Sequence, residues 1–320
     1  MVAQEIRKAL QDLVGEVSKE GSLLFDVPMN QCTTLRLGGP ADMLWDATSA
    51  EALAAVLRLT QREGIPVTII GNGSNLLVCD GGIRGLVIRI GTGMSRLSDP
   101  SPMPDGRFAL TVEAGLTLAR LSRAAAANGL GGLAFASGIP GSMGGAVYMN
   151  AGAYGGEIKD IVLSVSALDR AGNTLTWTNE EMAFGYRTSR LSQEKAGHVV
   201  TEVKIALSAG DQQAIEDEMQ KLLAQRREKQ PLSVPSCGST FKRPTGHFAG
   251  TLIDQCGLKG ARIGGASVSE LHAGFLLNDQ KGTTADYLAL IAHVQHVVLE
   301  QTGVALTPEV RILGEELPLP

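Results

Sequence analysis

Glycine makes up nine of the 26 residues from Gly131 to Gly156, and this run constrains the fold more than any other part of the sequence. Such density is costly, because a glycine loses more backbone freedom on folding than any other residue. Apolar residues such as Phe135, Met143 and Val147 interrupt the run, which argues against a flexible linker. Bare backbone N–H groups can surround an anion or lie flat against a planar ring. The first interpretation is therefore a loop for a large, flat, phosphate-bearing cofactor, and the alternative is a tightly turned structural loop.

Length and composition indicate a soluble globular protein of two or three domains. The chain has 320 residues, of which 44% are hydrophobic and 19% are charged. Its net charge is −5 and no basic stripe is present, so we expect no nucleic-acid partner. The N-terminus has no uninterrupted apolar segment of the kind found in signal peptides, and no run of 18 apolar residues occurs elsewhere. We therefore expect a cytoplasmic protein without a membrane span.

The cysteines and histidines do not have the spacing of a metal site. The four cysteines are scattered and form no CxxC pair, and the five histidines lack a ligand pattern. We therefore expect no bound metal. Free, scattered thiols fit a reducing compartment.

Hydrophobic periodicity and capping residues predict alternating helices and strands of an α+β protein. Ser49 is a predicted N-cap, and Thr284 is predicted to cap the last long helix. The expected helices cover residues 49–63, 117–128, 214–229 and 283–302, after an amphipathic N-terminal helix. The expected strands include 67–70, 108–114, 159–169, 174–178, 199–207 and 274–277.

A second glycine-rich loop, Gly71-Asn72-Gly73-Ser74-Asn75, directly follows the strand at 67–70. It begins like the dinucleotide fingerprint GxGxxG, but Leu76 occupies the position of the third glycine. The residues that follow predict strands and turns instead of the helix that the fingerprint requires. A standard Rossmann fold is therefore disfavoured, although a tight loop between strands can still present N–H groups to a pyrophosphate.

Other catalytic templates are absent, and the remaining candidates are weak one by one. Pro140 replaces the first glycine of a GxSxG motif around Ser142. The Tyr186-Arg187 pair can be a structural hydrogen-bonding centre, Ser239 a turn residue, and Glu309 an exposed strand end.

Taken together, six ordered motifs give the chain a specific resemblance to UDP-N-acetylenolpyruvoylglucosamine reductases (MurB), from about Thr33 to Leu313. They are Gly71-Asn72-Gly73-Ser74-Asn75-Leu76-Leu77, Ser137-Gly138-Ile139-Pro140-Gly141-Ser142-Met143-Gly144-Gly145-Ala146, Asn150-Ala151-Gly152-Ala153-Tyr154, Phe184-Gly185-Tyr186-Arg187, Gly238-Ser239-Thr240-Phe241-Lys242 and Pro308-Glu309-Val310-Arg311.

The resemblance implies an α+β fold with a two-lobed FAD-binding domain of the vanillyl-alcohol-oxidase type and a C-terminal α+β substrate-binding domain. We expect the first lobe at residues 1–85, with the segment 305–320 as a candidate to return to it. The second lobe is expected at 86–228 and the substrate-binding domain at 229–304.

The resemblance also implies a reaction and its residues. Enzymes of this family use NADPH to reduce the enolpyruvyl ether of a UDP-sugar to UDP-N-acetylmuramate, a peptidoglycan precursor. By position, Ser239 matches the proton donor, while Arg187 and Glu309 match its partners at the reacting group. An arginine suits a carboxylate that gains negative charge, and a serine need only protonate a very basic centre.

The expected FAD contacts are Gly71, Asn72, Gly73, Ser74, Asn75, Leu76, Ser137, Gly138, Pro140, Gly141, Gly144, Gly145, Asn150 and Gly152. The expected substrate contacts are Tyr154, Tyr186, Lys229 and Arg243. No tyrosine lies between residues 187 and 286, so the chain resembles the shorter branch of the family, which lacks a tyrosine-bearing lid. Tyr154 is the candidate substitute for that tyrosine.

Two other functions compete with this one. Another FAD oxidoreductase on the same scaffold would act on a sugar or hydroxyacid. No histidine precedes His198, so a histidine tether to the flavin is unavailable there and a noncovalent FAD is expected. A nucleotide-sugar binding protein without turnover would not need Ser239, Arg187 and Glu309 together.

Overall fold

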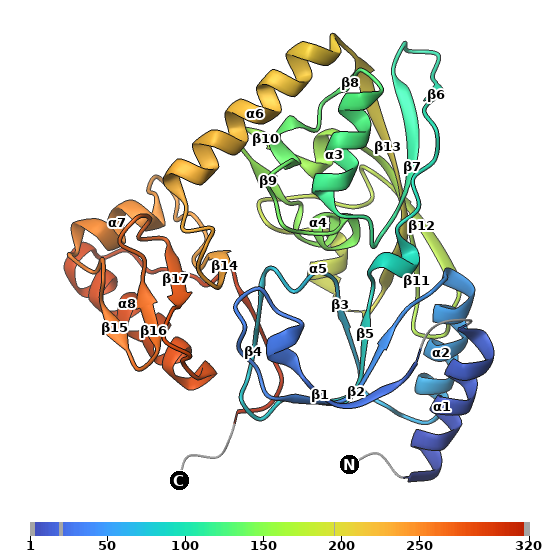
Figure 1. Cartoon of the computed structure of the whole chain (residues 1–320), viewed down its shortest axis with the longest axis horizontal. Coiled ribbons are helices and arrows are strands. Elements are labelled where there is room, and N and C mark those ends of the chain that lie inside the picture. Colours follow the sequence, from blue (N-terminus) through green and yellow to red (C-terminus); the bar gives the residue numbers. More distant parts are fainter. Residues whose placement is uncertain (1–3, 19–21, 195, 317–320) are drawn as a thin grey trace. The chain divides into compact units, whose positions relative to one another are not determined.

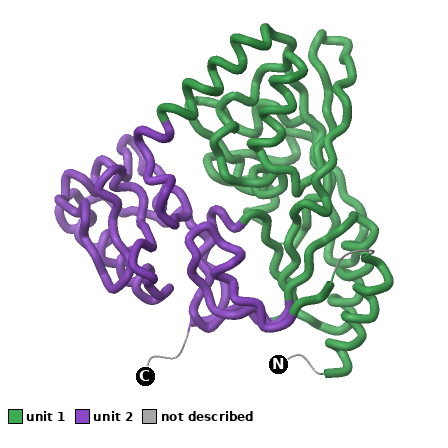
Figure 2. The backbone as a smooth tube through the Cα atoms, in the orientation of Figure 1, with its two compact units in different colours: residues 1–24, 44–72, 85–225 green, residues 25–43, 73–84, 226–320 purple. Residues whose placement is uncertain are grey.

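The computed structural model describes residues 4–18, 22–194 and 196–316, in two compact units (Figure 2). Unit 1 comprises residues 1–24, 44–72 and 85–225, and unit 2 comprises 25–43, 73–84 and 226–320. The chain therefore passes between the units five times. Within the described part, no helix is long and apolar enough to cross a membrane.

The centre of unit 1 is a sheet in the order β12-β11-β13-β7-β6, with β8 also paired to β13 (Figure 1). Its strands are β6 (Ser101–Pro102), β7 (Phe108–Glu113), β8 (Leu130–Gly131), β11 (Val162–Leu168), β12 (Thr174–Thr178) and β13 (Val199–Ala209). The strands predicted at 159–169 and 174–178 correspond to β11 and β12, which pair antiparallel. Val203 and Ile205 on β13 alternate with exposed Glu202 and Lys204, as expected for a strand with one buried face.

The N-terminal part of the chain forms two helices and a smaller sheet. The helices are α1 (Gln4–Val17) and α2 (Ala50–Arg62), and the strand order is β1-β2-β5-β3. These strands are β1 (Leu24–Pro28), β2 (Pro40–Asp46), β3 (Val67–Ile70) and β5 (Ile83–Arg89), with β3 parallel to β5. The predicted cap of α2 is confirmed, because the Ser49 side chain accepts a hydrogen bond from Ala52 N.

The glycine run of unit 1 contains a helix that the sequence analysis missed. Helix α4 (Met143–Met149) includes Gly144 and Gly145, so only the first part of the predicted 137–146 loop is a loop. The other elements here are helices α3 (Leu118–Ala127), α5 (Arg190–Glu194) and α6 (Gln212–Lys229), strands β9 (Gly152–Ala153) and β10 (Gly156–Glu157), and short 3-10 turns at Thr92–Met94, Ala134–Ala136 and Ile158–Asp160.

Unit 2 contains a sheet in the order β14-β17-β16-β15 and a separate parallel pair of β18 with β4. The strands are β4 (Leu76–Val78), β14 (Ser236–Ser239), β15 (Arg262–Ile263), β16 (Ala266–Val268), β17 (Phe275–Asn278) and β18 (Arg311–Leu313). The helices are α7 (Ala249–Gln255) and α8 (Thr284–Thr302), and a 3-10 turn covers Met29–Gln31. Residues 317–320 of the expected returning segment lie outside the described residues.

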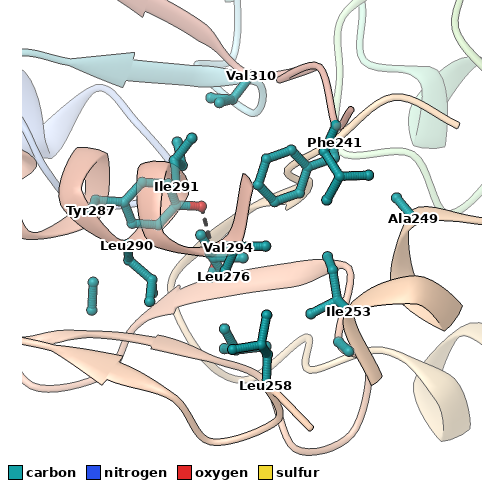
Figure 3. Close-up of a cluster of buried hydrophobic side chains, with 14 of the residues drawn as sticks. Phe241, Ala249, Ile253, Leu258, Leu276, Tyr287, Leu290, Ile291, Val294 and Val310 are labelled. Carbon is teal, nitrogen blue, oxygen red and sulfur yellow. Dashed lines mark hydrogen bonds between the residues drawn. The ribbon is translucent and has the colours of Figure 1, made fainter. Parts of the chain in front are cut away.

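One hydrophobic core joins the distant segments of unit 2. Tyr287, Leu290, Ile291 and Val294 of α8 pack with residues of α7 and the sheet (Figure 3). Leu35, Leu37 and Leu77 belong to the same buried cluster. The N-terminal segments of unit 2 are therefore part of its core.

The prediction that Thr284 caps α8 is wrong. The N-cap is Thr283, whose hydroxyl accepts from Asp286 N while the Asp286 carboxylate accepts from Thr283 N. The Thr284 hydroxyl instead donates to Val78 O of β4 at 2.7 Å. In the sequence, Thr283 and Thr284 are equal candidates for the N-cap, and only the bond from Thr284 to Val78 O distinguishes them.

Replacing Thr283 with alanine is expected to lower the free energy of unfolding by about 1 kcal/mol, because the capping hydroxyl is lost. A fall of about 2–4 °C in the thermal midpoint would accompany it. Thr283→Ser keeps the hydroxyl and is the control. A midpoint equal to that of the unmodified protein would contradict the assignment of this cap.

Candidate active site

Unit 1 brings the start of the first predicted glycine loop next to residues 140–142 of the second. A Cβ on Gly71 would lie 2.7 Å from Oγ of the buried Ser142, so a larger residue here would require that side chain to move. The Asn72 side chain donates to Pro140 O at 3.5 Å, a long hydrogen bond. Glycine at position 71 therefore leaves bare backbone where β3 ends, next to the 140–142 turn. Close-packed bare backbone of this kind fits a flat, phosphate-bearing cofactor.

Several residues of the second loop also have structural partners. Gly144 donates its N–H to Ala114 O at 2.8 Å, and a Cβ on it would lie 3.0 Å from Ala114 Cβ. Ser137 is buried and donates its hydroxyl to Ala134 O. Pro140 and Gly145 are exposed, and Gly138 and Gly141 are half-buried. The glycine at 144 is thus explained by close packing of α4, while the more open positions remain the better candidates for cofactor contact.

The rest of the first loop belongs to unit 2. A Cβ on Gly73 would lie 2.0 Å from Cys32 O, and Gly73 has φ +65°, so its backbone packs where only glycine fits. Ser74 is half-buried, and Leu76 begins β4. The Asn75 side chain donates to Glu309 O at 3.1 Å, and Arg311 N donates to Asn75 O. A predicted cofactor loop residue therefore fixes the backbone of a predicted catalytic residue.

Tyr186 and Arg187 form the tip of a two-residue turn in unit 1. Gly185 N donates to Thr188 O and Thr188 N donates to Gly185 O, at 3.0 and 3.2 Å. Arg187 has φ +53°, a left-handed conformation that a non-glycine residue rarely adopts. Its Nη2 donates to Gly152 O at 2.8 Å, and its guanidinium lies 5.2 Å from the Tyr186 ring centroid. The turn thus holds a guanidinium in one fixed orientation.

Ser239 is the last residue of β14, beside a bulge, and does not lie in a turn as predicted. Ser236 pairs with Leu277 and Ser239 with Phe275, so β14 has one more residue than β17 over this interval. Gly238, at φ +81°, supplies the backbone conformation that the bulge needs. A bulge re-aims the side chain beside it, and Ser239 is exposed.

Glu309 is held next to Ser239 by pairing of their chain segments. Glu309 N donates to Thr240 O at 2.7 Å, and Lys242 N donates to Thr307 O at 2.8 Å. Phe241 forms an isolated bridge with Pro308. Two of the three predicted catalytic residues, 70 positions apart in the sequence, are therefore neighbours within unit 2.

A buried polar cluster underlies Ser239. The Tyr287 hydroxyl lies 3.2 Å from both Cys237 Sγ and Thr240 Oγ1. It donates to Leu276 O at 3.2 Å (Figure 3). Burial raises the pKa of the Cys237 thiol to about 11 and raises the pKa of Tyr287 well above its usual value. Both groups are therefore neutral at physiological pH and act as hydrogen-bonding anchors.

His272 is a neighbour of Ser239 that the sequence analysis missed. A Cβ on Gly274 would lie 3.1 Å from Ser239 Oγ and 3.0 Å from His272 Cε1, so glycine leaves space between them. His272 Nδ1 accepts from Gly274 N, and burial lowers the pKa of His272. No local pattern links His272 to Ser239, because only the pairing of β14 with β17 brings them together.

The predicted substrate contacts lie on exposed positions. Tyr154 and Tyr186 are each 46% exposed in unit 1. In unit 2, exposed Lys229 ends α6, and the Arg243 guanidinium lies 4.4 Å from the ring centroid of Phe248. No group of histidine, cysteine and acidic residues suited to a metal ion occurs among the residues that the model describes.

Comparison with known proteins explains this arrangement. A family model for an FAD binding domain matches residues 41–178, and one for the C-terminal domain of UDP-N-acetylenolpyruvoylglucosamine reductase matches residues 230–313. The reductase of that name from Streptococcus suis is 47% identical over 91% of this chain and 93% of its own length. The chain belongs to the UDP-N-acetylenolpyruvoylglucosamine reductase family.

Other reductases of the family give the same result over nearly complete chains. The Caldanaerobacter subterraneus reductase is 44% identical over 96% of this chain and 99% of its own length. The crystal structure of the Thermus caldophilus reductase is 33% identical and has a TM-score of 0.75, over 92% of this chain and 99% of that one. The expected α+β class, with an FAD-binding domain followed by the C-terminal domain of the reductase family, is confirmed.

Proposed function

We propose that this chain is an NADPH-dependent flavoenzyme that reduces UDP-N-acetylglucosamine enolpyruvate to UDP-N-acetylmuramate for peptidoglycan synthesis. The observation that carries the proposal is the pairing of the Ser239 and Glu309 segments in a chain of this family. Near-full-length relatives share one enzymatic name, which disfavours the alternatives of a different sugar or hydroxyacid oxidoreductase and of a binding protein without turnover.

The residues supply the acid and the electrostatics of the reaction. The glycine loops would hold FAD without a covalent bond, and FAD bound there would supply to the substrate the hydride that NADPH provides. Arg187 would bind the substrate carboxylate, where negative charge develops, through charge-assisted hydrogen bonds. Ser239 would donate a proton to the neighbouring carbon, and Glu309 would orient the site. Lys229 and Arg243 are proposed contacts of the substrate diphosphate.

We also propose that residues 1–85 and 86–228 form the two lobes of the FAD-binding domain, that residues 229–304 form the substrate-binding domain, and that the protein is cytoplasmic. The parallel pairing of β18 with β4 supports a return of the C-terminal strand to the first lobe. The cysteines of the described residues form no disulfide, which supports a reducing compartment such as the cytoplasm.

A steady-state assay tests the proposal. The purified protein should contain about one FAD per chain, released intact by acid, and should oxidise NADPH only when the enolpyruvyl UDP-sugar is present. The same assay with NADH measures nicotinamide preference. Release of FMN, a colourless protein that FAD does not reconstitute, or NADPH oxidation that ignores the enolpyruvyl sugar would contradict the proposed function.

A further inference from the structure

Asn150 ends helix α4 in a conformation that few residues tolerate. It is the C-cap residue, with φ +43° and ψ +58°, and it is completely buried. Its backbone N–H bonds back to the carbonyls of Ala146 and Val147. Asparagine and glycine are the residues that adopt this left-handed conformation most readily at helix ends.

The side chain of Asn150 makes three hydrogen bonds within unit 1. Its Nδ2 group donates to Gly185 O at 3.0 Å and to Glu157 Oε2 at 3.1 Å. Its Oδ1 accepts from Lys159 N at 3.0 Å. Both N–H groups and the oxygen of the amide are therefore engaged by the protein itself.

These bonds fix the turn that carries Arg187. Gly185, whose carbonyl accepts from Asn150, directly precedes the two turn residues and bonds to Thr188, which follows them. Arg187 donates to Gly152 O, only two residues after Asn150. The turn is thus joined to the end of α4 at its base, through Gly185, and at its tip, through Arg187.

The surrounding charges favour the same arrangement. Glu157 forms an ion pair with Lys159 at 2.8 Å. The hydrogen bond from Lys159 is the main cause that lowers the pKa of Glu157, and the amide of Asn150 and the charge of Arg187 add to it. Glu157 therefore stays ionised at neutral pH and accepts from the Asn150 amide.

We infer that Asn150 is the positioning residue for Arg187, and that its side chain serves the substrate carboxylate site and not FAD. This inference rests on the proposed function, because it takes Arg187 as the group that binds the substrate carboxylate. The geometry needs two donors and one acceptor on a short side chain at positive φ, which asparagine provides. Aspartate at this position keeps the acceptor and loses both donors.

The test compares two variants of Asn150 with a matched control. Asn150→Gly removes the side chain and tolerates the positive φ, so it adds little backbone strain. Asn150→Asp retains the shape but sets a carboxylate against the ionised Glu157, so its activity is compared together with its thermal midpoint. Asn128→Ala is the control, because Asn128 is also a helix C-cap in unit 1, and its side-chain amide donates within α3, to Ala124 O at 2.8 Å.

We expect both Asn150 variants to retain about one FAD per chain and to lose roughly 10- to 100-fold in kcat/KM for the enolpyruvyl sugar, because a misplaced binding group loses catalytic alignment. The control should keep its FAD content and its kcat/KM, even if its thermal midpoint falls as much as that of the Asn150 variants. In an Arg187→Lys background, Asn150→Gly should cost no more than about twofold further, because both changes remove the same interaction.

The outcomes separate a role of Asn150 in positioning Arg187 from a role in binding FAD. Loss of FAD with unchanged kcat/KM per bound flavin would overturn the inference and make Asn150 a cofactor residue. Additive losses in the double variant would overturn it too. A fully active Arg187→Lys enzyme would instead contradict the proposed role of Arg187, whatever Asn150 does.

Discussion

The Ser239→Ala enzyme is expected to accept hydride from NADPH at a near-normal rate and yet fail to turn over the enolpyruvyl sugar. Flavin reduction by NADPH does not require the proton that reaches the substrate. A positioned general acid contributes roughly 10²–10⁴ in rate, or about 3–5 kcal/mol of barrier. Ser239 also lies at the exposed end of β14, so the alanine should not disturb the core.

Anaerobic stopped-flow absorbance of the flavin measures the first half of the reaction, and the steady-state assay measures the whole. Ser239→Cys keeps a transferable proton and should recover part of the loss. Ser236→Ala, the same type of change on the same strand, is the matched control. Turnover of Ser239→Ala within a few-fold of the unmodified enzyme would reduce Ser239 to a structural residue of the bulge.

Arg187→Lys is expected to lower kcat by roughly 10²-fold, the scale seen when one preorganised donor to a developing anion is removed. Lysine keeps the positive charge but lacks the planar fork that grips a carboxylate with two parallel hydrogen bonds. The Arg187 guanidinium already donates to Gly152 O at 2.8 Å. A lysine ammonium cannot keep this bond and also bind a substrate carboxylate in the same fixed geometry.

FAD content should not change in this variant, because Arg187 bonds to the glycine run through the Gly152 carbonyl and lysine leaves the backbone of both glycine loops unaltered. Arg190→Lys, three residues further along and paired with Glu194, is the control for a general effect of the substitution. Near-normal kcat and KM in Arg187→Lys would remove this residue from the site.

Local signals predicted much of the fold. Ser49 caps α2 and Pro66 follows that helix closely, so its bounds could be read from a short window of sequence. The 174–178 hairpin partner was equally clear, because a turn of Ala171-Gly172-Asn173 separates two alternating segments. The strand predicted at 159–169 begins later, at Val162, because Ile158–Asp160 forms a 3-10 turn closed by Glu157 and Asp160.

Features that depend on distant segments could not be predicted in the same way. Helix α4 was missed because Gly144 and Gly145 lower helix propensity, and only contact with Ala114 explains the first of them. The bulge at Gly238 and the nearness of His272 to Ser239 both require the pairing of β14 with β17. The motif resemblance identified Asn150 but assigned it to FAD, because its three bonds to Gly185, Glu157 and Lys159 exist only in the folded chain.

The interrupted course of unit 2 along the chain has a consequence during synthesis on the ribosome. Leu35, Leu37 and Leu77 leave the ribosome early, but the α8 residues that bury them come more than 200 residues after Leu77. At about 5–20 residues per second, these leucines wait roughly 10 to 50 seconds for their partners. A nascent chain of this protein therefore exposes apolar surface that a chaperone can recognise, and a fragment that starts at residue 226 would lack part of its own core.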